Sequence, residues 1–361
     1  MHLSEPRRRD QLGRAALGVL VIFQTLALLY FVIPLDAISS LQSYLPIPAS
    51  TFGHSVQNPE NGVTKASTQA DDEDTPAAPP SSLHQGRHGL TRGSGDSYSR
   101  TGFEFNKTGP GSEFNPSASN PFGNPEWPGN CTSKGKNWIG YMASEFNSTL
   151  TLAWTFGSGG SVIDPSIVPP RPSRSTFVKQ VQEFNASIGH RPAHAPWTPE
   201  NAVAGMWFGS NDMTHSWKYP NLTVVMPNLV DGLLAQAQVL HSIGIRNFLF
   251  FELTPLAWSP TYQKFPSRRR NMAAYFVGNF NILLQSRVEV FKEKNRDSRV
   301  NIVPITDVFM GALLDPHSRG APNATCLDLL AGKDCLWADG THPGISIHRS
   351  IGQKAAELAW G

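Results

Sequence analysis

Blocks of apolar residues separated by polar turns follow one another from about residue 91 to the C-terminus. Four apolar runs have the length of buried strands, and they lie at 150–160, 202–212, 246–253 and 300–309. Large apolar residues recur at helical spacing between them, which predicts helices over about 227–243, 271–294 and 346–359. Strands that alternate with helices indicate a parallel sheet with helices on both faces. The pattern therefore predicts an α/β fold, a doubly wound parallel sheet of three layers.

A separate apolar run near the N-terminus has the length of a membrane-spanning helix. Residues 15–33 have only Gln24 and Thr25 as polar interruptions, and at about 1.5 Å per residue they span a hydrocarbon core of about 30 Å. Four arginines precede this run and predict a cytosolic tail at residues 1–14. We expect a signal anchor with the body of the protein lumenal or extracellular, and a cleaved signal peptide is the alternative.

The composition changes again after the apolar run. Residues 34–90 are rich in Ser, Pro, Gly, Thr and Asp, and such a segment cannot bury enough apolar surface to fold, so it predicts a disordered stalk. Residues 91–361 form the predicted globular domain. A net charge of +2 gives no electrostatic reason to bind nucleic acid. We expect a monomer whose contact with the membrane is the N-terminal helix.

Sequons and cysteines both indicate the secretory pathway. Six Asn-x-Ser/Thr sequons predict N-glycosylation at Asn106, Asn130, Asn147, Asn185, Asn221 and Asn323. Cys326 and Cys335 are close enough in sequence for a short disulfide loop, which would brace the segment that leads into Asp339. Cys131 is then left over.

Four short polar motifs lie beside the predicted strand ends or the final helix, where parallel sheets form ligand sites. They are Gly95-Asp96-Ser97, Gly159-Gly160, Gly209-Ser210-Asn211-Asp212, and Asp339 with His342 three residues later. Each motif alone is also typical of an ordinary turn, a helix cap or a surface loop. Their occurrence together favours nucleophilic acyl transfer.

This chemistry needs the residue types that the motifs supply. A serine hydroxyl is a weak nucleophile until an imidazole takes its proton, and a carboxylate holds the imidazole in the right tautomer. We predict Ser97 as nucleophile, His342 as base and Asp339 as the residue that orients it. The backbone N–H groups of Ser97 and Gly159 and the amide of Asn211 are the predicted oxyanion hole. We expect no metal, because the chain has no His-Glu-x-x-His or Cys-x-x-Cys motif. Acyl transfer through these residues needs no cofactor.

The motifs also resemble those of a known superfamily. The blocks GDSYSRTGFEFN, FGSGGSVID, WFGSND and DGTHPG are similar to those of the SGNH or GDSL hydrolases. KNWIGYMASEFN and FLFFELTPLAWSP resemble fungal carbohydrate esterase family 16, and the resemblance covers roughly residues 91–361. It implies a flavodoxin-like fold, a triad of Ser97, His342 and Asp339, and an acetylesterase that acts on plant-polysaccharide fragments.

Two features depart from the pattern of these relatives. The segment before Ser97, RHGLTRGSGDS, has Leu90 as its one large apolar residue, so we expect a short or poorly buried first strand. Trp258 stands where relatives tend to have a polar or basic residue. We predict a serine esterase for acetylated carbohydrates. The alternatives are a lipase or thioesterase for longer acyl chains, and a non-catalytic carbohydrate-binding protein with the same fold.

Overall fold

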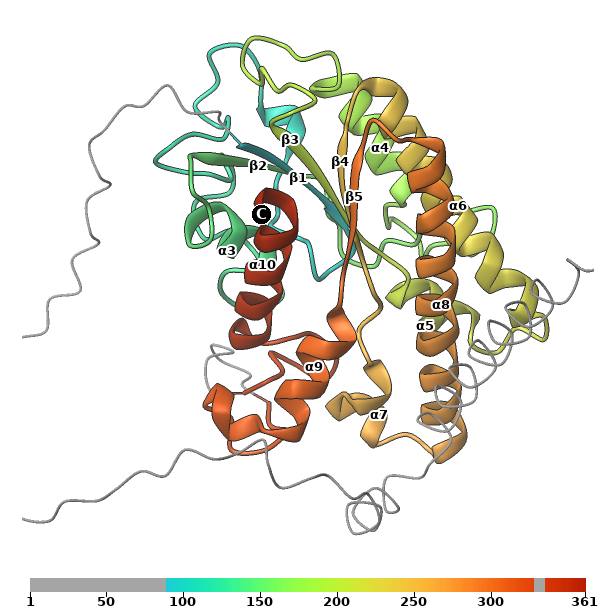
Figure 1. Ribbon diagram of the computed structural model, residues 1–361. Helices are drawn as coiled ribbons and strands as arrows, with labels where there is room; N and C mark the ends of the chain where they lie inside the picture. Colours follow the sequence, from blue (N-terminus) through green and yellow to red (C-terminus); the bar gives the residue numbers. More distant parts are fainter. Residues whose placement is uncertain (1–88, 328–334) are drawn as a thin grey trace, which may run out of the picture. The chain divides into compact units, whose positions relative to one another are not determined.

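A five-stranded parallel sheet forms the centre of the computed structural model, which describes residues 89–327 and 335–361 (Figure 1). Its spatial order is β2-β1-β3-β4-β5, which is the flavodoxin-like order of a doubly wound sheet. All four strand pairs are parallel. The predicted α/β architecture is confirmed in this part of the chain. The strands are β1 (Gly89–Gly95), β2 (Thr151–Thr155), β3 (Ala202–Trp207), β4 (Asn247–Phe251) and β5 (Arg299–Val303).

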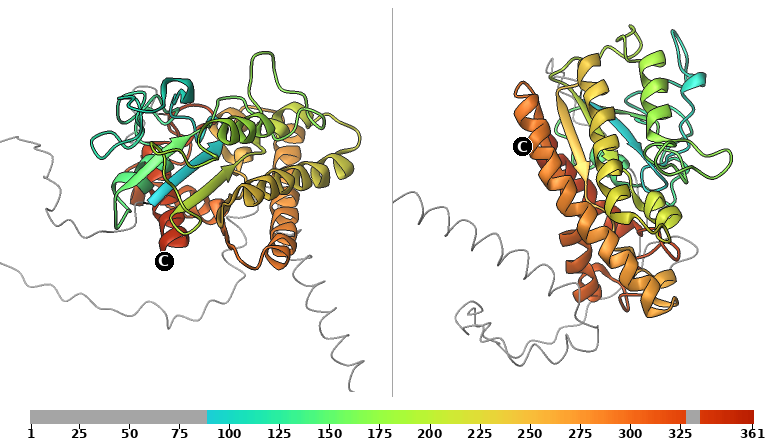
Figure 2. Two further views of the ribbon diagram at one scale, coloured as in Figure 1. Left: turned by 90° about the horizontal axis from the view of Figure 1, so that it is seen from above. Right: turned by 90° about the vertical axis from the view of Figure 1, so that its right-hand side faces the viewer.

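Helices cover both faces of the sheet and make three layers (Figures 1 and 2). Each helical layer buries its own apolar cluster against one face of the strands. One layer contains α3 (Trp138–Ser144), α9 (Ile305–Leu314) and α10 (Ile345–Trp360). The other contains α4 (Phe177–Ser187), α6 (Leu222–Ile243) and α8 (Ser267–Lys294). The short helices α5 (Ser210–Ser216) and α7 (Pro260–Gln263) lie toward the carboxyl ends of the strands (Figure 1).

The first strand is longer and more central than its sequence predicts. β1 pairs with β2 on one side and with β3 on the other, and residues 93–96 are buried. A methyl group on Gly93 would lie 2.2 Å from Ile139 Cδ1, and one on Gly95 would lie 2.3 Å from Ser99 Oγ. Neighbouring side chains therefore fill the space that large residues occupy in other strands. The expectation of a short or poorly buried strand was wrong, because apolar cover comes from α3 and not from β1 itself.

Proline corrects the boundaries of another predicted strand. The run 300–309 reads as one strand, but β5 ends at Val303 and α9 begins at Ile305. Pro304 stands between them as the N-cap residue of α9. Proline has no N–H for the sheet, and its fixed φ suits the start of a helix, so the strand stops there.

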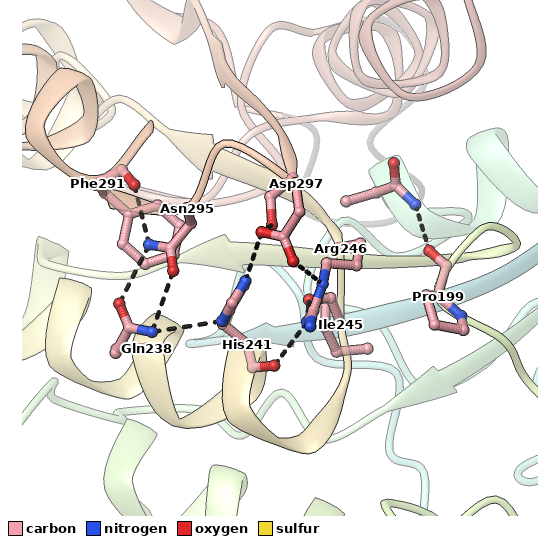
Figure 3. A network of polar contacts seen from close by, with 10 residues as sticks. Pro199, Gln238, His241, Ile245, Arg246, Phe291, Asn295 and Asp297 are labelled. Carbon is pink, nitrogen blue, oxygen red and sulfur yellow. Dashed lines mark hydrogen bonds and ion pairs between the residues drawn. The ribbon is translucent and has the colours of Figure 1, made fainter. Parts of the chain in front are cut away.

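A polar network lies at the amino-terminal ends of β4 and β5 (Figure 3). His241 Nε2 lies 2.9 Å from one carboxylate oxygen of Asp297, and Arg246 Nε lies 2.7 Å from the other. Gln238 donates to Asn295 at 3.2 Å. These contacts join the end of α6 to the loop before β5. They fix the edge at which β4 and β5 start.

The predicted tail at 1–14, the span at 15–33 and the stalk, except for its last two residues, lie outside the described residues. Gly89 and Leu90, the last two residues of the predicted stalk, belong to β1. No helix in the described part of the chain has the length and apolar character needed to span a bilayer.

Candidate active site

The four predicted motifs come together at the carboxyl ends of the strands. Ser97 follows β1, Gly159 follows β2, and Asn211 is in the first turn of α5 directly after β3. Asp339 and His342 lie in the loop before α10. This loop is held to α7, since the N–H of Thr261 donates to the carbonyl of Gly340 at 2.9 Å.

Ser97, His342 and Asp339 form a continuous chain of hydrogen bonds. Ser97 Oγ lies 2.8 Å from His342 Nε2, although 245 residues separate them in the sequence. His342 Nδ1 lies 2.7 Å from Asp339 Oδ2. An ionised carboxylate only accepts hydrogen bonds, so Nδ1 carries the proton and Nε2 is left to accept from the serine hydroxyl. The geometry suits a base that removes a proton from Ser97.

The surroundings of Asp339 keep it ionised. Its other carboxylate oxygen accepts from the backbone N–H groups of Thr341 and His342 at 2.8 and 2.9 Å. Burial acts to raise the pKa of Asp339, but the hydrogen bond and charge of His342 and these two N–H groups outweigh it and lower the pKa to about 2. The carboxylate is therefore charged at neutral pH and orients the imidazole.

Two backbone N–H groups beside Ser97 are available to a bound ligand. Within the described residues, the N–H groups of Ser97 and Gly159 donate to no other protein group. A methyl group added to Gly159 would lie 4.0 Å from Ser97 Cβ, so this glycine lies next to the predicted nucleophile. Both donors are close to where a tetrahedral intermediate on Ser97 would carry its negative oxygen.

Asn211 belongs to the same group of residues, but its amide already has partners. Its Nδ2 donates to Asp96 Oδ2 at 3.2 Å and to the carbonyl of Ser161 at 3.1 Å. These two acceptors fix the direction of the amide. To stabilise an oxyanion, one of its N–H groups must be shared with the substrate or move to it.

Two buried carboxyl groups lie next to Asn211. Asp96 is 1% exposed and Asp212 is fully buried, and burial raises the pKa of each to about 7. Asp96 Oδ1 accepts from the N–H of Tyr98 at 3.0 Å, and Asp212 Oδ1 accepts from the N–H of Ile163 at 3.0 Å. Asp212 Oδ2 has no hydrogen-bond partner in the described part of the chain. A neutral acid there adds no negative charge next to a developing oxyanion.

Tyr98 is a residue of the site that sequence reasoning missed. Its hydroxyl donates to the carbonyl of Thr341 at 3.0 Å, and its ring packs edge-on against His342 at a centroid distance of 5.5 Å. Tyr98 therefore joins the serine turn directly to the histidine loop. Its position next to Ser97 is the one sequence signal that points to it.

The structure also places the cysteines and sequons. Cys326 and Cys335 form a disulfide with a Cα–Cα distance of 5.4 Å, and Cys131 is a buried free thiol. Cys335 lies four residues before Asp339, so the disulfide is in the position predicted to brace the segment that leads into Asp339. The six sequon asparagines all reach solvent: Asn147 is half-buried and the other five are exposed.

A hydroxyl, an imidazole and a carboxylate in this order, beside free backbone N–H groups, form the arrangement found in serine hydrolases. A curated relative agrees with this class. The chain is 39% identical over 268 residues to an acetylesterase from Thermothelomyces thermophilus. The matched region covers 74% of this chain and 86% of the relative. The chain therefore belongs to the same family as this acetylesterase.

Solved structures are more distant. An acetylxylan esterase from Geobacillus stearothermophilus is 12% identical with a TM-score of 0.43, and the match covers 76% of this chain and 96% of that one. A Parabacteroides merdae protein described as a GDSL-like lipase is 14% identical with a TM-score of 0.44, covering 75% and 97%. No family model matches the sequence.

Proposed function

We propose that this protein is a carboxylic ester hydrolase that removes acetyl groups, with Ser97 as its nucleophile. The contact of 2.8 Å between Ser97 Oγ and His342 Nε2 carries the proposal. It joins residues from opposite ends of the folded domain into the geometry that activates a serine. We infer the preference for acetyl esters from the Thermothelomyces relative, which is named as an acetylesterase.

The first half of the reaction acylates the serine. Ser97 Oγ attacks the carbonyl carbon of the ester while His342 Nε2 takes the hydroxyl proton, and Asp339 stabilises the imidazolium. The tetrahedral oxyanion is stabilised by the N–H groups of Ser97 and Gly159, with Asn211 as a third donor. The intermediate collapses, the C–O bond to the alcohol breaks, and His342 returns the proton to the leaving oxygen.

The second half of the reaction restores the enzyme. A water molecule replaces the alcohol and attacks the acetyl carbonyl, and His342 takes its proton. The second tetrahedral intermediate breaks the bond to Ser97 Oγ, which receives the proton back from His342. The products are acetate and the free alcohol, and no metal or cofactor takes part in either step.

Replacement of the nucleophile tests this proposal. We expect Ser97→Ala to lower kcat for 4-nitrophenyl acetate by about 10⁶-fold, as in other serine hydrolases. Ser119→Ala is the matched control, since Ser119 is an exposed serine whose hydroxyl pairs with that of Ser117. Circular dichroism shows whether both variants remain folded. A folded Ser97→Ala variant with the wild-type rate would refute the mechanism.

The alcohol portion of the substrate is proposed to be a carbohydrate, on the resemblance to carbohydrate esterases. The alternatives are an esterase for longer acyl chains and a non-catalytic carbohydrate-binding protein. A short or poorly buried first strand is the one sequence feature that would favour the non-catalytic protein, and β1 does not have it, because it pairs with β2 on one side and β3 on the other. Rates on acetyl, butyryl and octanoyl esters distinguish an acetylesterase from an esterase for longer acyl chains, and we expect the acetyl ester to react fastest.

We also propose that the catalytic domain is glycosylated in the secretory pathway, held by the N-terminal segment or released after its cleavage. The apolar run at 15–33, the preceding arginines and the six sequons support this location. The exposure of the sequon asparagines is what glycan attachment requires.

A further inference from the structure

A proline-rich segment next to the candidate active site carries two exposed arginines. Residues 164–175, which we call the arginine loop, follow Gly159-Gly160 and contain four prolines. Arg171 and Arg174 are both exposed, and the N–H of Arg174 donates to the carbonyl of Arg171 at 3.1 Å. This bond closes a turn, and the ends of such a turn lie within about 7 Å of each other.

The arginine loop is fixed at its base and along its length. Val162 and Thr176 form an isolated parallel bridge that closes the loop, and the N–H of Phe177 donates to the carbonyl of Val162 at 2.9 Å. His215 of α5 reaches the backbone of Pro169. Proline further limits the backbone, since its ring fixes φ. The loop therefore presents its arginines from a constrained backbone.

Arg174 and Arg100 both lie against the glycines of the candidate active site. A methyl group on Gly160 would lie 3.1 Å from Arg174 Cδ and 3.3 Å from its Nε. A methyl group on Gly159 would lie 3.8 Å from Arg100 Cδ and 4.0 Å from Ser97 Cβ. Two arginine side chains thus border the short strip of backbone that would bind the oxyanion.

These arginines have no ion-pair partner among the residues that the structure describes. Within the described residues, none of Arg100, Arg171 and Arg174 has a carboxylate oxygen within 4 Å of its guanidinium. Asp164, the one acid of the arginine loop, accepts from both the N–H and the hydroxyl of Ser166. Asp96 is buried, and its raised pKa lowers its charge. Arg174 and Arg100 therefore bring unpaired positive charge to the glycines beside Ser97, and the turn holds Arg171 close to Arg174 in the chain.

We propose that Arg174, together with Arg171 and Arg100, binds a carboxylate of the substrate, so that the preferred substrate is an acetylated sugar acid or an acetylated saccharide bearing one. This inference rests on the proposed function, since it places the acetyl group at Ser97. A planar guanidinium matches a carboxylate with two parallel hydrogen bonds, and it stays charged at every assay pH. A carboxylate near the acetyl group would reach these side chains while the ester carbonyl meets Ser97.

Matched substrates test the proposal. The substrates are the 2-, 3- and 4-monoacetates of methyl β-D-glucuronide and of methyl β-D-glucoside. At each acetyl position the two sugars differ only at C6, which is a carboxylate in the glucuronide and a hydroxymethyl group in the glucoside. For at least one position we expect kcat/KM to be about three- to tenfold higher for the acid, mainly through KM, and the advantage to shrink in 0.5 M NaCl. Equal kcat/KM values for acid and neutral sugar at every position would overturn the proposal.

Variants assign the preference to the arginines. We expect Arg174→Gln to lower kcat/KM for the acid about three- to tenfold more than it lowers kcat/KM for the neutral sugar. Arg296→Gln is the matched control, since Arg296 is an exposed arginine at the opposite edge of the sheet. An equal loss on both substrates in Arg174→Gln would overturn the assignment.

A binding measurement separates this inference from the proposed function. Calorimetry with the Ser97→Ala variant compares methyl β-D-glucuronide with methyl β-D-glucoside in the absence of turnover. Tighter binding of the glucuronide that is lost in Ser97→Ala/Arg174→Gln supports the carboxylate site, even if no acetate is ever released. Equal binding of both ligands rejects it, even if the protein hydrolyses simple acetyl esters.

Discussion

Asp96 stands directly before the proposed nucleophile, in a place where a negative charge is costly. The carboxyl is 1% exposed, and burial raises its pKa from 3.8 to about 7. Between these two pH values the folded protein holds a proton that the unfolded chain has released. This group therefore makes the free energy of unfolding fall as pH rises from about 4 to about 7, and its contribution is constant above that range.

Asp96→Asn should remove this slope. We expect the free energy of unfolding of wild type, relative to the variant, to fall by up to about 1.4 kcal/mol per pH unit between pH 4 and 7. Urea denaturation at five pH values measures it. Asp307→Asn is the control, because Asp307 is exposed in the first turn of α9. Parallel curves for wild type and Asp96→Asn would show that the carboxyl is ionised in the fold.

At the level of single residues, the sequence predicts the candidate site residues better than the residues that hold them in position. The motifs predict a site of residues that each supply a chemical group needed for acyl transfer, and the structure brings these residues together at the carboxyl ends of the strands: Ser97, Gly159, Asn211, Asp339 and His342. The sequence does not predict the role of Tyr98 or the raised pKa of Asp96. The first depends on a contact with a segment far away in the sequence, and the second depends on burial. The hydroxyl of Tyr98 donates to the carbonyl of Thr341, which is 243 residues away in the sequence, so no local sequence motif indicates this contact.

Helix α5 depends on a glycine that no other residue replaces easily. Gly209 is its N-cap residue, with φ of 115° and ψ of −18°. L-residues rarely adopt this conformation. A methyl group there would also lie 2.7 Å from Leu253 Cδ2 and 3.2 Å from Phe280 Cζ. The glycine therefore sets the start of the helix whose first turn holds Asn211.

Gly209→Ala should consequently affect stability and catalysis together. We expect a loss of about 1–3 kcal/mol in the free energy of unfolding, and a fall in kcat of up to about 10²-fold as Asn211 is displaced. Gly311→Ala is the control, since Gly311 lies inside α9 and, among the described residues, no atom beyond its neighbours and the helix backbone lies within 4 Å of the added methyl group. That change should stabilise by about 0.5–1 kcal/mol. A neutral Gly209→Ala variant would contradict this account of α5.

At the level of elements, the sequence predicts types better than boundaries. The apolar runs predict β2, β3 and β4, and helical spacing predicts α6, α8 and α10, since periodicity depends on burial of one face. Pro304 shortens the predicted fifth strand, and α6 begins at Leu222 with Pro227 inside it. β1 is underestimated because its glycines are covered by Ile139 and other neighbours, and local composition does not report such cover.

For the whole molecule, the exposed sequons and the N-terminal segment make a joint prediction. Expressed as the full chain in a eukaryotic host, the protein should lose mass on treatment with an N-glycosidase, and its glycosylated domain should be protected from protease in intact microsomes. Gln replacement of the six sequon asparagines should abolish the mass change. Unglycosylated protein that protease digests in intact microsomes would contradict the proposed location.

The central claim is that the hydroxyl of Ser97 is the reactive nucleophile of the whole molecule. A fluorophosphonate probe reacts with a serine only where a neighbouring base activates it, and tandem mass spectrometry of the digested protein locates the adduct. The account predicts one adduct on Ser97 in wild type and its loss in His342→Ala, with that variant still folded. An adduct on a different serine, or none at all on protein that hydrolyses acetyl esters, would contradict it.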